Sequence, residues 1–299
     1  MDKLEIKVAI GLFESPGSIG DIAKHIQIDT GNCSKIITQL EKEGFCTKKR
    51  RFKEVLAVPS QTIHAQRFKE LLIQRKGFKG MFKELLYGLN LNILLSALFD
   101  WKTTKDIAMQ LGLSTKTIQN RMYPLKNRGL FSKHGRKFRF NNKNWPKLYA
   151  FLSAYRNFYP FGDVLWKFGD EVLFEVADKK DIKGVITGFT DYVNHKVPVG
   201  VIKYCCYMPK KGLSKEEVFI HSLLGIREDT RLLELAVVFY YKNRLNKKRL
   251  GILSKKYDCS NLLDDFFKII KSKKEKIITD NLPHISRKGI QQMITKYKK

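Results

Sequence analysis

Residues 21–28 read DIAKHIQI, and residues 106–113, 85 positions further along the chain, read DIAMQLGL. With the register unchanged, the pair Gly44-Phe45 corresponds to the pair Gly129-Leu130, and a cluster of basic residues follows each pair. A repeat of this length without gaps, ending in the same kind of charged segment, indicates a duplicated structural unit.

The second copy predicts three helices. Residues 92–99 have the apolar content of a buried helix. Thr103-Thr104 precede a short helix at 105–111, with a threonine as its cap. Ser114 then caps a third helix at 115–123.

The third helix of this copy has one apolar and one polar face. Ile118, Met122 and Leu125 recur at helical spacing and are expected to face the core. Pro124 removes a backbone donor there and is expected to kink the helix. The candidate DNA-binding residues of this helix are its cap and its polar positions: Ser114, Thr115, Lys116, Thr117, Gln119, Asn120 and Arg121.

These residue types suit the reading of DNA. Asn and Gln side chains bond adenine and Arg bonds guanine, whereas Thr and Lys bind phosphates. The following segment, 132–140, alternates like a two-stranded hairpin with a basic tip at Gly135. Its candidate DNA-binding residues are Lys133, Arg136, Lys137 and Arg139. A helix-turn-helix followed by a hairpin is the winged-helix pattern, and these residues resemble prokaryotic and archaeal winged-helix regulators.

The first copy has the same pattern in a more degenerate form. Asp29 or Thr30 caps a helix that extends to Gly44, and its segment IITQLEKEGF, residues 36–45, resembles the recognition helix of MarR-like winged helices. Its wing is expected to be shorter than the second and to end at Pro59. The candidate DNA-binding residues of this copy are Thr30, Asn32, Ser34, Lys35, Thr38, Lys48, Lys49, Arg50 and Arg51.

The charge of the chain favours a nucleic-acid partner. The 299 residues carry a formal net charge of +28, and an excess of this size attracts a polyanion. Residues 1–145 carry 27 basic and 12 acidic side chains, residues 146–239 carry 13 and 12, and residues 240–299 carry 17 and 5. The tail, residues 268–299, carries 10 basic and 2 acidic residues and is either a solvated helical face or an additional phosphate-contacting arm. Residues 146–239 are nearly neutral, which indicates a part whose role is not simply to bind phosphates.

The remaining bulk features predict a cytoplasmic protein without a membrane partner. No run of 18 apolar residues and no secretion signal is visible. The five cysteines lack C-x-x-C spacing, so we expect free thiols and no zinc site.

Residues 60–91 predict a helical linker, broken near Gly77 and Gly80. Two roles remain open for it: it orients the two modules along one face of DNA, or it forms the seam of a homodimer. Winged helices also serve as protein-interaction modules, but two copies with basic wings on a strongly basic chain favour double-stranded DNA.

The C-terminal half predicts a mixed sheet and helices. Residues 164–176 alternate like two strands around a Gly-Asp turn, and strands are also expected at 186–190 and 199–207. Ser214 caps a helix with Glu217 at the capping-box position, and a buried helix follows at 231–241.

Three segments of this half resemble the C-terminal region of AbiE-type abortive-infection antitoxins: WKFGDEVL at 166–173, the turn at 187–189, and residues 214–224. The resemblance implies autoregulatory binding to a promoter, and a nucleotidyltransferase-type toxin as protein partner. The chain departs from that family by having two winged helices instead of one.

An enzymatic role is not expected. Asp170-Glu171, Glu175 and Lys179-Lys180 are faintly like a metal-dependent nuclease core, but Glu175 lacks a lysine two positions further on. His221 is expected to be a packed core residue. The sequence therefore predicts no catalytic residue, no cofactor and no metal site.

Together these features predict an α+β protein with two tandem winged-helix domains and a mixed α/β C-terminal domain, with boundaries at 1–59, 60–91, 92–145 and 146–299. We expect a sequence-specific DNA-binding transcriptional regulator. Two alternatives are a DNA-processing protein of a mobile element, such as a nuclease or replication initiator, and a winged-helix scaffold for protein contacts.

Overall fold

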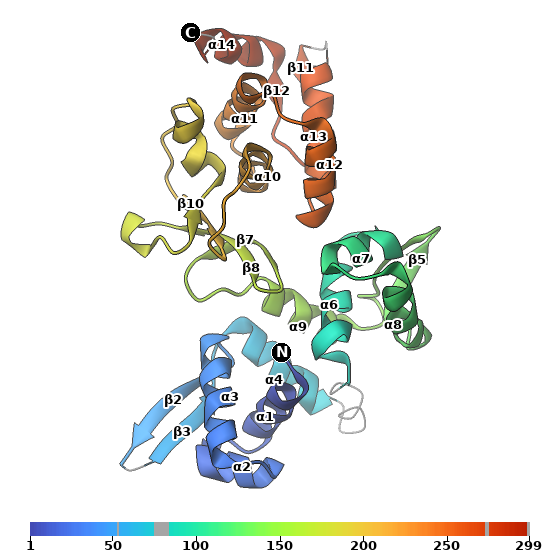
Figure 1. Cartoon of the computed structure of the whole chain (residues 1–299), viewed down its shortest axis with the longest axis vertical. Coiled ribbons are helices and arrows are strands. Elements are labelled where there is room, and N and C mark those ends of the chain that lie inside the picture. The colour runs from blue at the N-terminus through green and yellow to red at the C-terminus, as the bar shows by residue number, and fades with distance from the viewer. Residues whose placement is uncertain (53, 75–83, 273–274, 298–299) are drawn as a thin grey trace. The chain divides into compact units, whose positions relative to one another are not determined.

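The computed structural model describes residues 1–52, 54–74, 84–272 and 275–297. The chain folds as two compact units, residues 1–160 and residues 161–299 (Figure 1).

The first module, residues 3–59, consists of three helices and a three-stranded antiparallel sheet. Its elements are α1 (Lys3–Glu14), β1 (Gly17–Ser18), α2 (Ile19–Ile26), α3 (Thr30–Lys42), β2 (Cys46–Arg51) and β3 (Glu54–Pro59). The strand order is β1-β3-β2. Asp2, Ser18 and Asp29 begin the three helices by accepting hydrogen bonds from backbone N–H groups that would otherwise lack partners.

The second module, residues 88–140, has the same order of elements. They are α6 (Gly88–Ser96), β4 (Lys102–Thr103), α7 (Thr104–Leu111), α8 (Thr115–Asn127), β5 (Phe131–His134) and β6 (Lys137–Phe140). Its strand order, β4-β6-β5, matches that of the first module. The predicted caps are confirmed: Thr103 forms a capping box with Asp106, and Ser114 accepts a hydrogen bond from the backbone N–H of Thr117.

Helix α8 continues through Pro124 to Asn127, four residues beyond the predicted end. The three apolar residues expected in the core, Ile118, Met122 and Leu125, are buried. The prediction of a core face and a polar outer face is therefore confirmed.

The relative length of the two hairpins was predicted wrongly. Strands β2 and β3 have six residues each, whereas β5 and β6 have four each, so the first hairpin is the longer one. The basic residues from which the length of this hairpin was predicted, Lys48, Lys49, Arg50 and Arg51, all lie on β2. The other strand, Glu54–Pro59, is mostly apolar and pairs on both sides, with β2 and with β1.

Helix α4 (Ile63–Gln74) and the start of α6 occupy the predicted linker. Gly77 and Gly80, where a break was expected, lie outside the described residues. Helix α9 (Pro146–Arg156) packs against α4, with the ring centroids of Phe68 and Phe151 5.3 Å apart. This places α9 in the first unit, although the sequence assigned it to the C-terminal half.

The second unit combines a four-stranded antiparallel sheet, of order β7-β8-β10-β9, with helices. Its elements are β7 (Asp163–Phe168), β8 (Glu171–Val176), η2 (Lys179–Asp181), β9 (Val185–Ile186), η3 (Gly188–His195), β10 (Tyr204–Met208), α10 (Lys215–Gly225), α11 (Thr230–Asn243), α12 (Lys247–Lys256), α13 (Ser260–Lys271), β11 (Lys276–Ile277), β12 (Ile285–Ser286) and α14 (Arg287–Tyr297). The β7–β8 hairpin and the Ser214–Glu217 capping box are confirmed.

Two predicted strands of this unit are shorter than expected. The first ends at Ile186, because the chain turns at Gly188 with a φ of +56° and continues as the 3₁₀ helix η3. The second begins only at Tyr204, five residues after the predicted start. Both strands were predicted from alternating apolar residues. Where a strand ends depends instead on its pairing with a neighbouring strand of the sheet, which the alternation does not show.

His221 is a packed core residue, as predicted. It is completely buried, and its Nδ1 lies 2.8 Å from the hydroxyl oxygen of Thr187. Burial lowers the pKa of its imidazole to about 3, and Lys211 and Lys256 act in the same direction. The five cysteines, all within the described residues, are also buried thiols outside any disulfide, as expected.

Candidate nucleic-acid interface

The outer face of α8 carries the predicted polar residues in exposed positions. These residues are Thr115, Lys116, Thr117, Gln119, Asn120 and Arg121. Ser114 is also exposed, and its Oγ accepts the backbone N–H of Thr117 at 3.1 Å and lies 2.8 Å from the hydroxyl of Thr117. These two hydroxyl groups therefore hold the start of the helix, whereas the longer side chains project from it.

Tyr123 was missed by the sequence analysis. Its side chain is 67% exposed, although a large aromatic ring usually buries most of its surface. Tyr123 follows Lys116 and Asn120 at positions i+7 and i+3, so the three residues share one face of α8. The same spacing argument that identified the core could have identified this ring.

A basic groove lies between the start of α7, helix α8 and the β5–β6 hairpin. It is lined by Thr103, Thr104, Lys105, Gln119, Lys126, Lys133, Gly135, Arg136 and Phe138. Four of these described lining residues are cationic and none is acidic. The structure thus brings together three predicted residues, Gln119, Lys133 and Arg136, with two that were not predicted, Lys105 and Lys126.

Within the basic groove, Lys126 is partly buried and lies near the positive charge of Lys133. Its Nζ lies 3.8 Å from the centroid of the Phe138 ring. Burial lowers the pKa of this ammonium, and the nearby charge of Lys133 lowers it further. An anion in the groove would relieve this repulsion, so the groove is suited to a phosphate.

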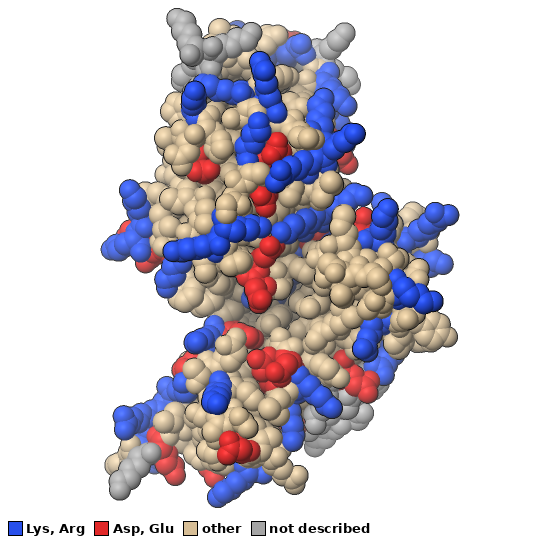
Figure 2. All heavy atoms as spheres, in the orientation of Figure 1, with Lys and Arg blue, Asp and Glu red and all other residues tan. Residues whose placement is uncertain are grey.

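The predicted residues of the β5–β6 hairpin have different environments. Lys133, Arg136 and Lys137 are exposed, whereas Arg139 is half-buried with its guanidinium 4.9 Å from the ring centroid of Trp101. Arg139 therefore packs along the hairpin, and the other three are accessible. Figure 2 shows Lys and Arg side chains over both hairpins.

Helix α3 presents fewer accessible side chains than α8. Thr30, Asn32 and Lys35 are exposed, but Ser34 and Thr38 are half-buried. The hydroxyl of Thr38 donates to the carbonyl of Ser34 at 2.8 Å.

Lys48, on strand β2, is engaged inside the first module. Its Nζ donates to the hydroxyl of Thr38 at 3.1 Å and lies 3.1 Å from the carboxylate of Glu41. Two predicted DNA contacts, Thr38 and Lys48, therefore already bond each other.

The tip of the β2–β3 hairpin combines exposed cations with an exposed aromatic ring. Lys49, Arg50 and Arg51 are exposed as predicted. Phe52, which the sequence analysis missed, is 91% exposed and has a φ of +51°, a left-handed conformation that is unusual for a bulky residue. The sequence signal that could have identified Phe52 was its position directly after the basic residues 48–51.

Two of the nuclease-like carboxylates of the second unit, Glu171 and Glu175, are held in ion pairs. Glu171 lies 2.7 Å from the ammonium of Lys256, and Glu175 lies 3.0 Å from the guanidinium of Arg227. Lys180 pairs with Asp178 at 3.1 Å. In the part of the chain that the structure describes, no group of three or more His, Cys, Asp or Glu side chains is placed to hold a metal ion.

Comparison with known proteins supports the N-terminal part of this interpretation. A model of the MarR family matches residues 14–51, which run from the end of α1 to the end of β2. No curated protein matches the chain. The match supports a MarR-like winged helix at the N-terminus and a DNA-binding transcriptional regulator. None of the helices within the described residues is both long and apolar enough to cross a membrane.

Proposed function

We propose that the protein is a transcriptional regulator that binds double-stranded DNA sequence-specifically through two winged helices. The basic groove is the observation that carries this proposal. It combines four cations with the polar side chain of Gln119 between a helix and a hairpin, and none of its described lining residues is acidic. Cations that neutralise phosphates provide affinity, and polar side chains on an exposed helix provide base contacts.

The repeated order of elements supports a second winged helix at 88–140. The two modules have unequal roles in this proposal. The second reads bases through α8, because its polar side chains are exposed. The first mainly contacts the DNA backbone through Lys49, Arg50 and Arg51. Thr38 and Lys48 are less available for DNA because they already bond each other within the module.

A gel-shift series on the DNA upstream of the chain's own coding region tests this function, at rising salt and with divalent metal present. We expect sequence-specific retention without cleavage, and affinity that falls steeply with salt. Cleavage would favour a DNA-processing protein of a mobile element, and the absence of retention would favour a scaffold for protein contacts.

The double substitution Asn120→Ala/Arg121→Ala is expected to lower the ratio of specific to non-specific affinity by about 10- to 100-fold, because one good base contact provides about 1–3 kcal/mol of discrimination. Competition gel shifts with specific and scrambled duplexes measure this ratio. Asn142→Ala/Lys143→Ala removes a similar pair of exposed side chains outside α8 and should leave the ratio unchanged. An unchanged ratio in the α8 variant would contradict the assignment of the recognition helix.

Phe52 is proposed to insert into the minor groove as an apolar wedge while the adjacent arginines bind phosphates. The substitution Phe52→Ala is expected to weaken duplex binding by about fivefold and to reduce the bend of the DNA, which energy transfer between end-labelled dyes measures. Phe52→Leu retains an apolar wedge and should preserve most of both effects. Equal loss in the two variants would exclude the wedge.

For the second unit we propose association with a protein partner or with a second copy of the chain. The three segments that resemble AbiE-type antitoxins form the β7–β8 hairpin, the start of η3 and helix α10. Autoregulation and a nucleotidyltransferase-type toxin as partner stay predictions from that resemblance.

A further inference from the structure

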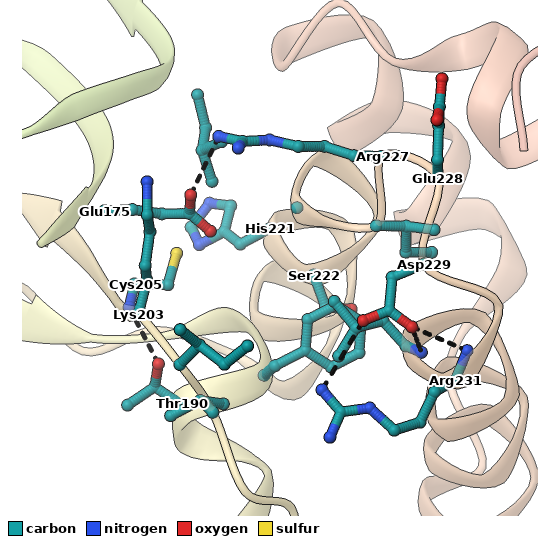
Figure 3. Close-up of a pocket in the computed structure, with 17 residues that line it drawn as sticks. Glu175, Thr190, Lys203, Cys205, His221, Ser222, Arg227, Glu228, Asp229 and Arg231 are labelled. Atoms are coloured by element: carbon teal, nitrogen blue, oxygen red, sulfur yellow. Dashed lines mark hydrogen bonds and ion pairs between the residues drawn. The ribbon is translucent and has the colours of Figure 1, made fainter. Parts of the chain in front are cut away.

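The second unit contains a cavity of about 310 Å³ between its sheet and two of its helices (Figure 3). Glu175 of β8 and Cys205 of β10 line one side. Ser222 and Gly225 of α10 and Arg231 of α11 line the other. This volume is at the lower end of the range for small-molecule sites, about 300–1,000 Å³.

Most of the cavity wall is apolar. Its hydrophobic lining residues include Leu165, Phe189, Val201, Ile202, Ile226 and Leu232. A wall of this kind removes an apolar ligand from water, and each buried CH₂ group contributes about 0.8 kcal/mol. The cavity therefore suits a compact apolar body such as one aromatic ring.

Glu175 places a poorly solvated carboxylate in this wall. Its side chain is only 15% exposed, and its Oε2 accepts a hydrogen bond from Arg227 at 3.0 Å. Burial raises the pKa of this carboxyl despite the opposing charges of Arg227 and Lys203. The cations already present thus compensate its burial incompletely, and a further cation would stabilise the carboxylate.

Arg227 reaches one oxygen of this carboxylate and is itself largely exposed to solvent. Figure 3 shows its side chain extending from the segment after α10 across to Glu175 on β8. The Arg227 side chain is 58% exposed. On the opposite side, Oε1 of Glu175 lies toward Gly225, where an added Cβ would be 3.8 Å from it. The ion pair with Arg227 is made by Oε2, so Oε1 is the oxygen to which a ligand would donate.

The cations at the cavity are less suited to an anionic ligand, because each already has a carboxylate partner. Lys203 lies 2.6 Å from Asp163, and Arg231 lies 3.6 Å from Asp229. An anion would have to compete with these carboxylates, whereas an ammonium group would add a partner to Glu175.

We propose that this cavity binds a small organic cation, a primary amine on an apolar body of about one aromatic ring, with its ammonium group donating to Glu175. Ring burial against Phe189 and Ile226 provides affinity, and the carboxylate provides the preference for an amine. The site lies wholly within the second unit, so the proposal does not depend on DNA binding.

Three probes of the same shape test the preference: benzylamine, benzyl alcohol and benzoate, titrated into the full chain by calorimetry and ligand-observed NMR. We expect benzylamine to bind with a Kd of about 1 mM, benzyl alcohol about tenfold more weakly, and benzoate not at all. Benzoate binding as tight as benzylamine, or no binding of any probe, would overturn the proposal.

Three variants locate the site. Glu175→Gln is expected to abolish the preference for benzylamine over benzyl alcohol. Glu228→Gln removes an exposed carboxylate from the same lining and should leave the preference intact. Gly225→Ala extends toward Glu175 and Leu165 at 3.8–3.9 Å, a distance that causes no clash, and should weaken all probes by reducing the cavity. A preference that survives Glu175→Gln, in a variant with the parent's circular dichroism spectrum, would exclude Glu175 as the amine's partner.

Discussion

Removal of two cations from the basic groove, in the variant Lys133→Ala/Arg136→Ala, is expected to weaken duplex binding by about 30-fold at low salt. Both side chains are exposed, and no acidic residue lies among the described lining residues of the groove. At about 1 kcal/mol for each phosphate contact, two lost contacts give this factor. The slope of log K against log salt should also fall by about 2, because each phosphate contact contributes about 0.9.

Fluorescence anisotropy with a labelled duplex at several salt concentrations measures both quantities. The matched control Lys143→Ala/Lys147→Ala removes the same charge from exposed positions outside the groove. If both variants weaken binding equally, only the net charge matters, and the groove is not the contact surface. Specific and scrambled duplexes should lose affinity to a similar extent, because phosphate contacts carry no sequence information.

The substitution Gly44→Ala is expected to destabilise the first unit by about 3 kcal/mol, whereas Gly129→Ala should cost about 1 kcal/mol. Both glycines have a positive φ, +76° and +68°, and the left-handed conformation costs an L-residue about 1–2 kcal/mol. A Cβ at Gly44 would also clash with the Phe158 ring, 2.7 Å from Cε1. At Gly129 the nearest atom is Nδ2 of Asn144, at 3.8 Å.

Denaturant unfolding of the two variants measures the difference, and hydrogen exchange in α3 and α8 assigns each loss to its module. The clash predicts coupling: in Gly44→Ala/Phe158→Ala, the total loss should be smaller than the sum of the two single losses. Equal losses from the two glycine variants would show that backbone conformation alone determines the cost.

Much of the fold could be predicted because its signals are local. Thr103 with Asp106, and Ser214 with Glu217, act across one helical turn, so their sequence spacing identifies the helix starts. Strand ends were less predictable. The strand expected at 186–190 is replaced by η3 from Gly188, because the chain turns there with a φ of +56° after a last backbone hydrogen bond from Thr187 to Cys205 of β10.

The candidate DNA interface was predicted in part. Helical spacing separated the buried Ile118 from the exposed Asn120, since the period of a helix determines which residues share a face. Lys105 and Lys126 were missed because they belong to the basic groove only through the approach of α7, α8 and the hairpin. Phe52 was missed because its exposure depends on the position of the hairpin tip.

The sequence by itself determined the repeat, the capped helices and the excess of positive charge, because each depends on residue type or on neighbours within a few positions. Only the tertiary structure decided which cations remain accessible. Lys48 is bonded to Glu41 and Thr38, whereas Lys133 and Arg136 line a groove whose described lining residues include no Asp or Glu. It also decided that Gly44 faces Phe158 and that Glu175 lies in a cavity wall. These contacts join residues far apart in the chain, and spacing along the sequence carries no information about them.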